Sequence, residues 1–293
     1  MAFDLGGLHF DYFKKSQFDE MFAEAGLDND VLKGYVEKLR REYQGRVYAE
    51  YRCRAVEGCA EELAFHQTDR VLDIMRMFDV AAFEIRAQCC LGRLGQVPPA
   101  RTYVFRLTDE AGLLLSQGTE HPIRKALGIS AELLRRIKDT GIAIAWELVQ
   151  KDSLTDLEER ALEAVSHFAH GVAVATAQDR LLHALVAVES LLMRNDNEPI
   201  QSKLGPRVAL LTKPGLEGRK QAIHDLADGY RLRSAFVHHG VRPDDVQIAN
   251  RLLQLCWDAV SSVMYATRKF NSKDALLNHL DDELLIPRRV TAP

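Results

Sequence analysis

Residues Tyr230–Gly240 read YRLRSAFVHHG and form the end of a predicted helix. At about 100° per residue, one side of this helix carries an apolar stripe formed by Ile223, Leu226, Ala227, Tyr230 and Val237. Gly240 suits the left-handed backbone conformation that ends a helix, and Pro243 prevents a smooth continuation. The sequence therefore places Arg233 and His238 in the last turns of a long helix.

Arg233 and His238 are two side-chain types that suit phosphodiester chemistry. An imidazole changes charge near neutral pH and can give or take a proton, while a guanidinium stays cationic and binds phosphate oxygens as a fork. Arginine and histidine at a helix C-terminus also complement the helix dipole, and most such residues do only that. Spacing alone therefore leaves a catalytic and a structural interpretation open.

Three blocks of sequence, in a fixed order, carry a resemblance to a known family. They read HALVAVESLLM at His183–Met193, SKLGPRVALL at Ser202–Leu211 and YRLRSAFVHHG at Tyr230–Gly240. The last block contains an arginine and a histidine with four residues between them, which is similar to the arginine–histidine motif of the HEPN superfamily. Together the blocks resemble the ApeA-like HEPN branch over roughly the last 120 residues.

The resemblance implies an all-helical, commonly dimeric domain and, in many members, a metal-independent ribonuclease of bacterial defence or toxin systems. Other members only bind RNA or nucleotides. Carried onto this chain, it implies Arg233, Ser234 and His238 as catalytic residues, although many active members have Asn, Asp or His where Ser234 stands. His238 would move the proton of a ribose 2′-hydroxyl or of the departing 5′-oxygen, and Arg233 would stabilise charge on the phosphate.

Four further residues are candidates for a place in this site. Glu189 lies in an apolar helix stripe, where a carboxylate is unfavourable unless it is paired. We predict that Glu189 supports the site by holding Arg233 or Arg207, and prefer this role to a direct catalytic one. His239 points about 100° away from His238 and is predicted to be a helix-end residue or a substrate contact. Arg207 and Tyr230 complete the predicted substrate-binding set.

Composition and cysteine usage predict a globular cytoplasmic protein without a metal or another cofactor. The chain has 293 residues, 47% of them hydrophobic, and has no signal-peptide pattern and no apolar run that could cross a bilayer. His167 and His170 lie three positions apart on a predicted helix, but the sequence offers no third metal ligand at a characteristic spacing. We therefore expect both to be surface histidines. Five cysteines without a Cys-x-x-Cys pair predict buried thiols rather than disulfides or zinc, and they are Cys53, Cys59, Cys89, Cys90 and Cys256.

The net charge and its distribution along the chain constrain how the protein can bind nucleic acid. A net charge of −4 argues against a protein that coats nucleic acid nonspecifically. Residues Asp179–Phe270 nevertheless contain 13 lysines and arginines against 10 aspartates and glutamates, so the sequence allows a local basic site.

The amino-terminal half has mixed periodicity. Predicted helices cover 13–25, 31–42 and 59–78; predicted strands cover 46–56 and 80–90; and a hairpin joins 102–107 to 112–117. This half contains no phosphate-binding glycine loop, His-Glu-x-x-His helix or nucleophile elbow. We predict that residues 1–150 form an α+β sensing or regulatory domain that takes a partner or ligand, or that simply supports the helical half.

The carboxy-terminal half, residues 151–293, is predicted to be a HEPN-like helical bundle, which makes the fold class α+β and mainly α. Thr155 and Glu158 form a predicted capping box beside the expected domain boundary. A predicted helix at 131–138 precedes this half, and those within it are 156–170, 172–194, 207–211, 216–239, 244–270 and 273–285.

The function predicted from the sequence is a metal-independent endoribonuclease that acts on RNA as a defence or toxin effector. A non-catalytic RNA- or nucleotide-binding regulator and a purely structural oligomerisation module remain the alternatives. Five helical positions separate Arg233 and His238 by about 140°, so one copy cannot easily aim both at one phosphate. We therefore predict a homodimer through the helical half that shares the site across its two-fold axis, unless the helix distorts near Gly240.

Overall fold

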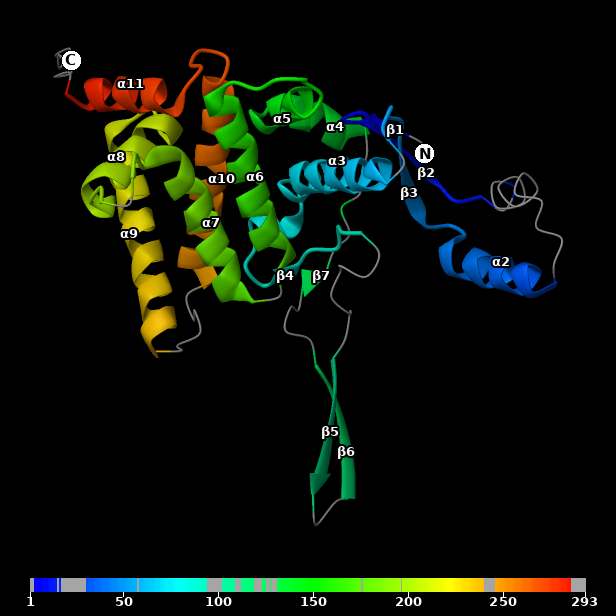
Figure 1. The fold of residues 1–293 in the computed structure, drawn as a ribbon. Coiled ribbons are helices and arrows are strands. Elements are labelled where there is room, and N and C mark those ends of the chain that lie inside the picture. The colour runs from blue at the N-terminus through cyan, green and yellow to red at the C-terminus, as the bar shows by residue number, and fades with distance from the viewer. Residues whose placement is uncertain are drawn as a thin grey trace. The chain divides into compact units, whose positions relative to one another are not determined.

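The computed structural model shows a mainly helical α+β chain that divides into two compact units, Met1–Val71 and Leu72–Pro293 (Figure 1). The residues that it describes are 3–14, 16, 30–56, 58–93, 102–108, 112–118, 123–124, 127, 131–174, 176–195, 197–239 and 246–285. Within these ranges the description excludes some side chains, among them those of residues 102–108, 112–118 and 236–239.

The first unit contains a three-stranded antiparallel sheet in the order β1 (Phe3–Leu5), β2 (Leu8–Tyr12) and β3 (Val47–Tyr51). Gly6 and Gly7 form the tight turn between β1 and β2 and both have positive φ angles, 56° and 79°, as a two-residue hairpin turn requires. α2 (Asp30–Tyr43) confirms the predicted helix 31–42, and β3 covers only the first half of the predicted strand 46–56. The predicted helix 13–25 lies almost entirely outside the described residues.

The start of the second unit departs from the sequence prediction. α3 (Cys59–Arg76) is followed by the 3-10 turn η1 (Val80–Ala82) and the short strand β4 (Ala87–Gln88), so the predicted strand 80–90 is wrong. Asp79 caps the turn by accepting a hydrogen bond from the amide of Ala81 at 2.9 Å. The buried guanidinium of Arg180 donates to the carbonyls of Ala81, Ile85 and Ala87, which a strand would have used for pairing.

Two further strand pairs and two short helices precede the bundle. β5 (Thr102–Thr108) and β6 (Gly112–Gly118) form the predicted hairpin, with Thr108 opposite Gly112, while β4 pairs in parallel with β7 (Ile123–Arg124). α4 (Ala131–Lys138) confirms its prediction, and α5 (Ile142–Leu148) is an additional helix. The predicted cap Ser130 and the breakers Pro98 and Pro99 lie outside the described residues.

The bundle contains α6 (Asp156–Ala173), α7 (Ala177–Leu192), α8 (Ile200–Thr212), α9 (Leu216–His239), α10 (Val246–Ala266) and α11 (Lys273–Leu285). The capping box of Thr155 and Glu158 is present, and α9 and α11 have the predicted bounds. α7 begins later than predicted because Val172 and Ala173 complete α6. α8 is longer than the predicted helix 207–211 because it accommodates Pro206.

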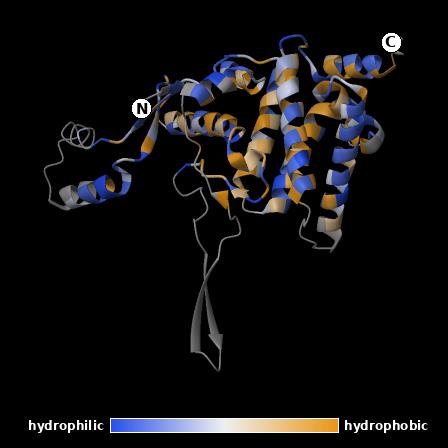
Figure 2. Cartoon of the chain, turned by 180° about the vertical axis from the view of Figure 1, so that it is seen from behind, coloured by the Kyte–Doolittle hydropathy of each residue, from blue (hydrophilic) through white to orange (hydrophobic). Residues whose placement is uncertain are grey.

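One continuous core explains where the second unit begins. Ile74, Met77 and Ile142 belong to the same buried cluster as Leu185 and Leu252. Hydrophobic residues recur along the bundle helices between hydrophilic ones (Figure 2). The division predicted at residue 150 differs from the observed one because segments before it contribute apolar side chains to the bundle core, an arrangement that local periodicity does not reveal.

Glycine brings α9 close to α10. A Cβ atom built on Gly229 would lie 2.5 Å from Cδ2 of Leu252, far inside van der Waals contact. Leu252 is itself fully buried. The two helices therefore approach at a distance that only glycine allows at this position.

A buried arginine ties α8 to the end of α7 and to α11. The side chain of Arg207 is 0% exposed, and its Nε and Nη2 donate to the Asp281 carboxylate at 2.9 and 2.8 Å. Its remaining N–H groups donate to both oxygens of Glu198, at 2.8 and 2.9 Å, and to the carbonyl of Leu192 at 2.7 Å. Every donor of this guanidinium is used inside the fold.

We predict that Gly229→Ala destabilises the protein although alanine has the higher helix propensity. Overpacking against Leu252 should lower the free energy of unfolding by roughly 1–3 kcal/mol, measured by urea denaturation. The matched control on the same helix is Gly218→Ala, whose new Cβ would meet only the flexible Lys213 side chain, at 3.4 Å. That control should be neutral or stabilising. Equal destabilisation by both variants would contradict the packing argument.

We also predict acid sensitivity through Asp281. Hydrogen bonds from Arg207 lower the pKa of Asp281 from 3.8 to about 2. A carboxylate with a lower pKa in the folded state stabilises the fold above its unfolded pKa, and this stabilisation is lost as the pH falls. The free energy of unfolding should therefore fall between about pH 4 and pH 2, with a smaller slope in Asp281→Asn. The control is Asp282→Asn, at the exposed neighbouring position, which should keep the wild-type slope.

Candidate functional site

The predicted catalytic residues lie in the last turns of α9. The backbone is helical through His239, so Arg233 and His238 are separated by five helical positions, or about 140° around the axis. The side chains of His238 and His239 lie outside the described residues, as do Gly240 and Pro243. The described part of the site therefore centres on Arg233.

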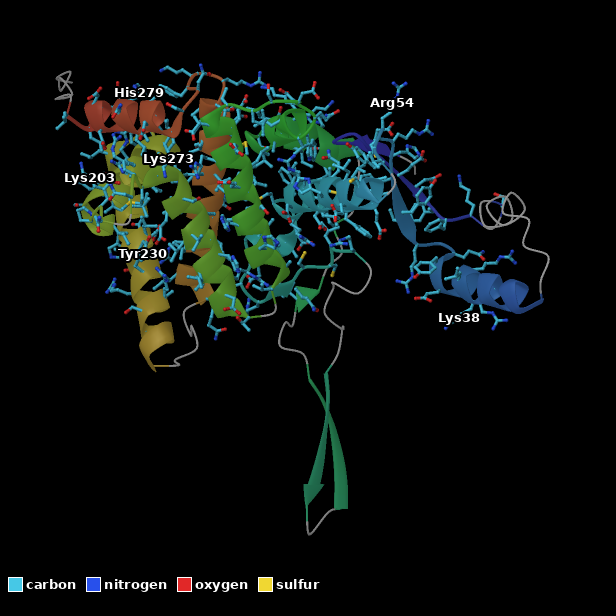
Figure 3. All side chains as sticks on the ribbon, viewed as in Figure 1. Lys38, Arg54, Lys203, Tyr230, Lys273 and His279 are labelled. Carbon is cyan, nitrogen blue, oxygen red and sulfur yellow. The ribbon has the colours of Figure 1, made fainter. Side chains whose placement is uncertain are left out.

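Arg233 lies beside Glu189 of α7, as the sequence predicted for one of the two candidate partners. The distance from Nη1 of Arg233 to Oε1 of Glu189 is 3.6 Å, and the two side chains are 35% and 25% exposed. Tyr230, one helical turn before Arg233 and labelled in Figure 3, donates its hydroxyl to the same Oε1 atom at 2.5 Å. The structure thus brings together three of the predicted site residues.

The inner side of this cluster is apolar. Leu185, Val188 and Leu192 are fully buried on α7, and Cys256 of α10 is buried close enough for the Glu189 charge to act on it. Burial, and then the charge of Glu189, raise the pKa of the Cys256 thiol. Burial and the hydrogen bond to Glu189 likewise raise the pKa of Tyr230, so its phenol stays protonated and can act as a donor. The cluster therefore lies where the core meets the solvent.

Two other predicted site residues have different surroundings. Ser234 is exposed on α9, directly after Arg233. Arg207 is fully buried in the network with Glu198 and Asp281, and not with Glu189. Arg207 therefore has a structural position, because no donor of its guanidinium remains for a substrate phosphate.

The sequence prediction missed further charged pairs on α9. Asp225 is buried and accepts hydrogen bonds from Nε of Arg251 at 3.0 Å and from Gln221 at 2.9 Å. Asp228 is buried as well and pairs with Arg231. The spacing of Asp228 and Arg231, three apart on a helix, is the signal that would have predicted the second pair. Ile223, expected in the apolar stripe of α9, is 38% exposed instead.

Histidines and cysteines offer no evident metal centre among the residues described. His167 and His170 are exposed on α6, and the ring centroid of His170 lies 6.4 Å from that of His183. No group of three or more histidine, cysteine, aspartate or glutamate side chains within the described ranges has a geometry that would hold a metal ion. All five cysteines are free thiols, and Cys53 and Cys59 are exposed, so the prediction of buried thiols is wrong for these two.

Among the helices of the described residues, none is both long enough and apolar enough to span a bilayer. The cluster of Arg233, Glu189 and Tyr230 can bind an anion such as phosphate, because the guanidinium of Arg233 is charged and partly exposed.

Comparison with protein-family models, curated proteins and solved structures found no match to this chain.

Proposed function

We propose that the protein is a metal-independent endoribonuclease whose helices α6 to α11 form an ApeA-like HEPN bundle. The observation that carries the proposal is Arg233, a partly exposed guanidinium in the last turns of α9, in the same turns as His238. The spacing of these two residues and the contact between Arg233 and Glu189 of α7 support it. The resemblance of the three sequence blocks supplies the reaction class.

In the proposed reaction the nucleophile is part of the substrate. His238 takes the proton of the ribose 2′-hydroxyl, the 2′-oxygen attacks the neighbouring phosphorus, and the bond to the 5′-oxygen breaks as that oxygen takes a proton from solvent water. Arg233 stabilises the negative charge that builds on the phosphate oxygens. The products are a 2′,3′-cyclic phosphate and a 5′-hydroxyl end. This sequence of steps requires no metal ion.

The proposed active form is a homodimer that shares each site between two chains. An angle of about 140° around α9 separates Arg233 from His238, so a single helix directs them to different sides. An isologous interface repeats each residue across a two-fold axis and allows Arg233 of one copy to approach His238 of the other. We further propose that the first unit, Met1–Val71, regulates this effector in response to a partner or ligand, and that it acts on RNA in the cytoplasm in defence or as a toxin.

A non-catalytic regulator that binds RNA or nucleotides is the second candidate, and Ser234 is the observation that favours it. Many active members of the family that the chain resembles have Asn, Asp or His at this position. Arg233 would bind a phosphate in the same way in a protein that performs no cleavage.

Cleavage of RNA in chelator separates the two candidates. We expect the wild-type protein to degrade mixed cellular RNA in EDTA and to leave 2′,3′-cyclic phosphate ends, detected by mass spectrometry. His238→Ala should lose activity by a factor of about 100 or more, since general acid–base catalysis contributes 10² to 10⁴. His224→Ala, a change to an exposed histidine earlier on α9, is the control and should remain active. Binding without cleavage by the wild type would support the regulator, and activity that requires added magnesium would contradict the mechanism.

Mixing two inactive variants tests the shared site. In a dimer assembled from Arg233→Ala and His238→Ala chains, one of the two sites receives an intact arginine and an intact histidine. Random pairing makes about half of the dimers mixed, so activity should recover to about a quarter of the wild-type value. Each variant alone is the control, and sedimentation establishes that mixed dimers form. Absence of recovery in a mixture of verified dimers would show that one subunit contains a whole site.

A further inference from the structure

One carboxylate oxygen of Glu189, Oε1, lies at different distances from two donor side chains. The hydroxyl of Tyr230 lies 2.5 Å from Oε1, a distance typical of a charge-assisted O–H···O⁻ hydrogen bond. Nη1 of Arg233 lies 3.6 Å from the same atom, beyond hydrogen-bond range. Arg233 is therefore attracted to Glu189 but is not hydrogen-bonded to it.

Two other arginines of the second unit are bound more closely to their acidic partners, whereas Arg160 resembles Arg233 and lies 3.6 Å from its nearest carboxylates. Arg207 uses every donor in its network, and Arg251 donates to Asp225 at 3.0 Å. Within the described part of the chain, Glu189 is the acidic partner of Arg233, and no hydrogen bond engages the Arg233 guanidinium. No described side chain therefore occupies its N–H groups by a hydrogen bond, and an anion that approaches from solvent can engage them.

We propose that Tyr230 is a positioning residue: its phenol occupies Oε1 of Glu189, keeps that carboxylate from closing to a hydrogen-bonded, bidentate ion pair with Arg233, and so leaves the guanidinium able to bind a phosphate. The proposal rests on the proposed function in one respect, namely that the phosphate belongs to RNA. The sequence predicted that Tyr230 contacts the substrate; in this proposal Tyr230 instead positions Arg233, which makes the contact.

The placement of the three side chains supports this role. Tyr230 and Arg233 are three positions apart on α9 and therefore share one face of the helix, opposite Glu189 of α7. The phenol stays protonated at neutral pH, because burial and Glu189 both oppose its ionisation. Without the hydroxyl, carboxylate and guanidinium could approach to about 2.8 Å and pair in bidentate fashion, and a phosphate would then have to displace the carboxylate.

The test is Tyr230→Phe, which keeps the ring and removes the hydroxyl. The probe is a short single-stranded RNA labelled with a fluorophore, bound to proteins that also carry His238→Ala so that cleavage does not interfere. We expect the Kd to rise about tenfold, the effect of one charged hydrogen bond. The slope of log K against log salt should fall by about 0.7, the loss of one phosphate contact on a single strand. Tyr265→Phe, which removes a hydroxyl that donates to the carbonyl of Asp139, is the matched control and should bind like its parent.

Rescue distinguishes positioning from support of the fold. Adding Glu189→Gln to Tyr230→Phe removes the competing charge, so the RNA affinity and the salt slope should return to those of the parent. A structural defect would instead deepen when a second contact is lost, and thermal unfolding of each variant records any such defect. Unchanged affinity and slope in Tyr230→Phe, or failure of the double variant to recover, would overturn the proposal.

A measurement without RNA keeps this test separate from that of the proposed function. The ¹⁵N-labelled guanidinium signal of Arg233, assigned through Arg233→Lys, reports whether the group is held in a direct ion pair. We expect slower rotation of the guanidinium in Tyr230→Phe than in the wild type, and free rotation again after Glu189→Gln is added. Equal rotation in all three proteins would overturn the role of Tyr230. A wild type that shows the expected rotation but does not bind RNA would overturn the proposed function alone.

Discussion

Burial of α7 is the constraint on which the candidate site depends. Its buried residues form a stripe about 160° wide that includes Leu181, Ala184, Leu185, Val188 and Leu192. Such a stripe meets the solvent along its two edges, where a polar side chain can be partly exposed. Glu189 occupies one of them, so the packing of α7 fixes the carboxylate to which Tyr230 and Arg233 of α9 are directed.

Three arginines in this unit show how differently one side chain can be used. Arg180 is buried and donates to several backbone carbonyls; burial lowers its pKa to about 10, which still leaves it charged at neutral pH. Arg207 is buried with two carboxylates that neutralise it. Arg233 alone of these three is partly exposed and lacks a hydrogen bond within the described residues. Because a guanidinium acts on a ligand only with donors that the fold has not used, Arg233 is the one of the three suited to bind an anion.

The sequence predicted the features that depend on neighbouring residues. The bounds of α9 and α11, the capping box at Thr155 and the hairpin of β5 and β6 follow from local periodicity and turn chemistry. A basic partner for Glu189 was also predicted, either Arg233 or Arg207, because a carboxylate within an apolar stripe requires one, and the structure places Arg233 there.

The features that were missed depend on residues far apart in the chain. The segment 80–90 resembles a strand in its composition, yet Arg180, more than 90 positions away, takes its carbonyls as acceptors. Arg207 resembled a substrate-binding residue because its partner Asp281 lies 74 positions later. Neither separation leaves a periodic signal, so a single sequence cannot distinguish a buried arginine from an exposed one.

The buried face of α9 is only weakly apolar, and the polar contacts that hold this helix in place also belong to the candidate site. Its buried face contains the carboxylates of Asp225 and Asp228, each with a basic partner, and approaches Leu252 of α10 closely at Gly229. A close glycine contact fixes the distance of a helix from its neighbour but supplies little apolar area. The hydrogen bond between Tyr230 and Glu189 therefore adds a polar constraint between α9 and α7, one turn before Arg233. This hydrogen bond helps to orient α9 and also determines how firmly Arg233 is held. The stability of α9 and the chemistry proposed for its end therefore depend on the same contact.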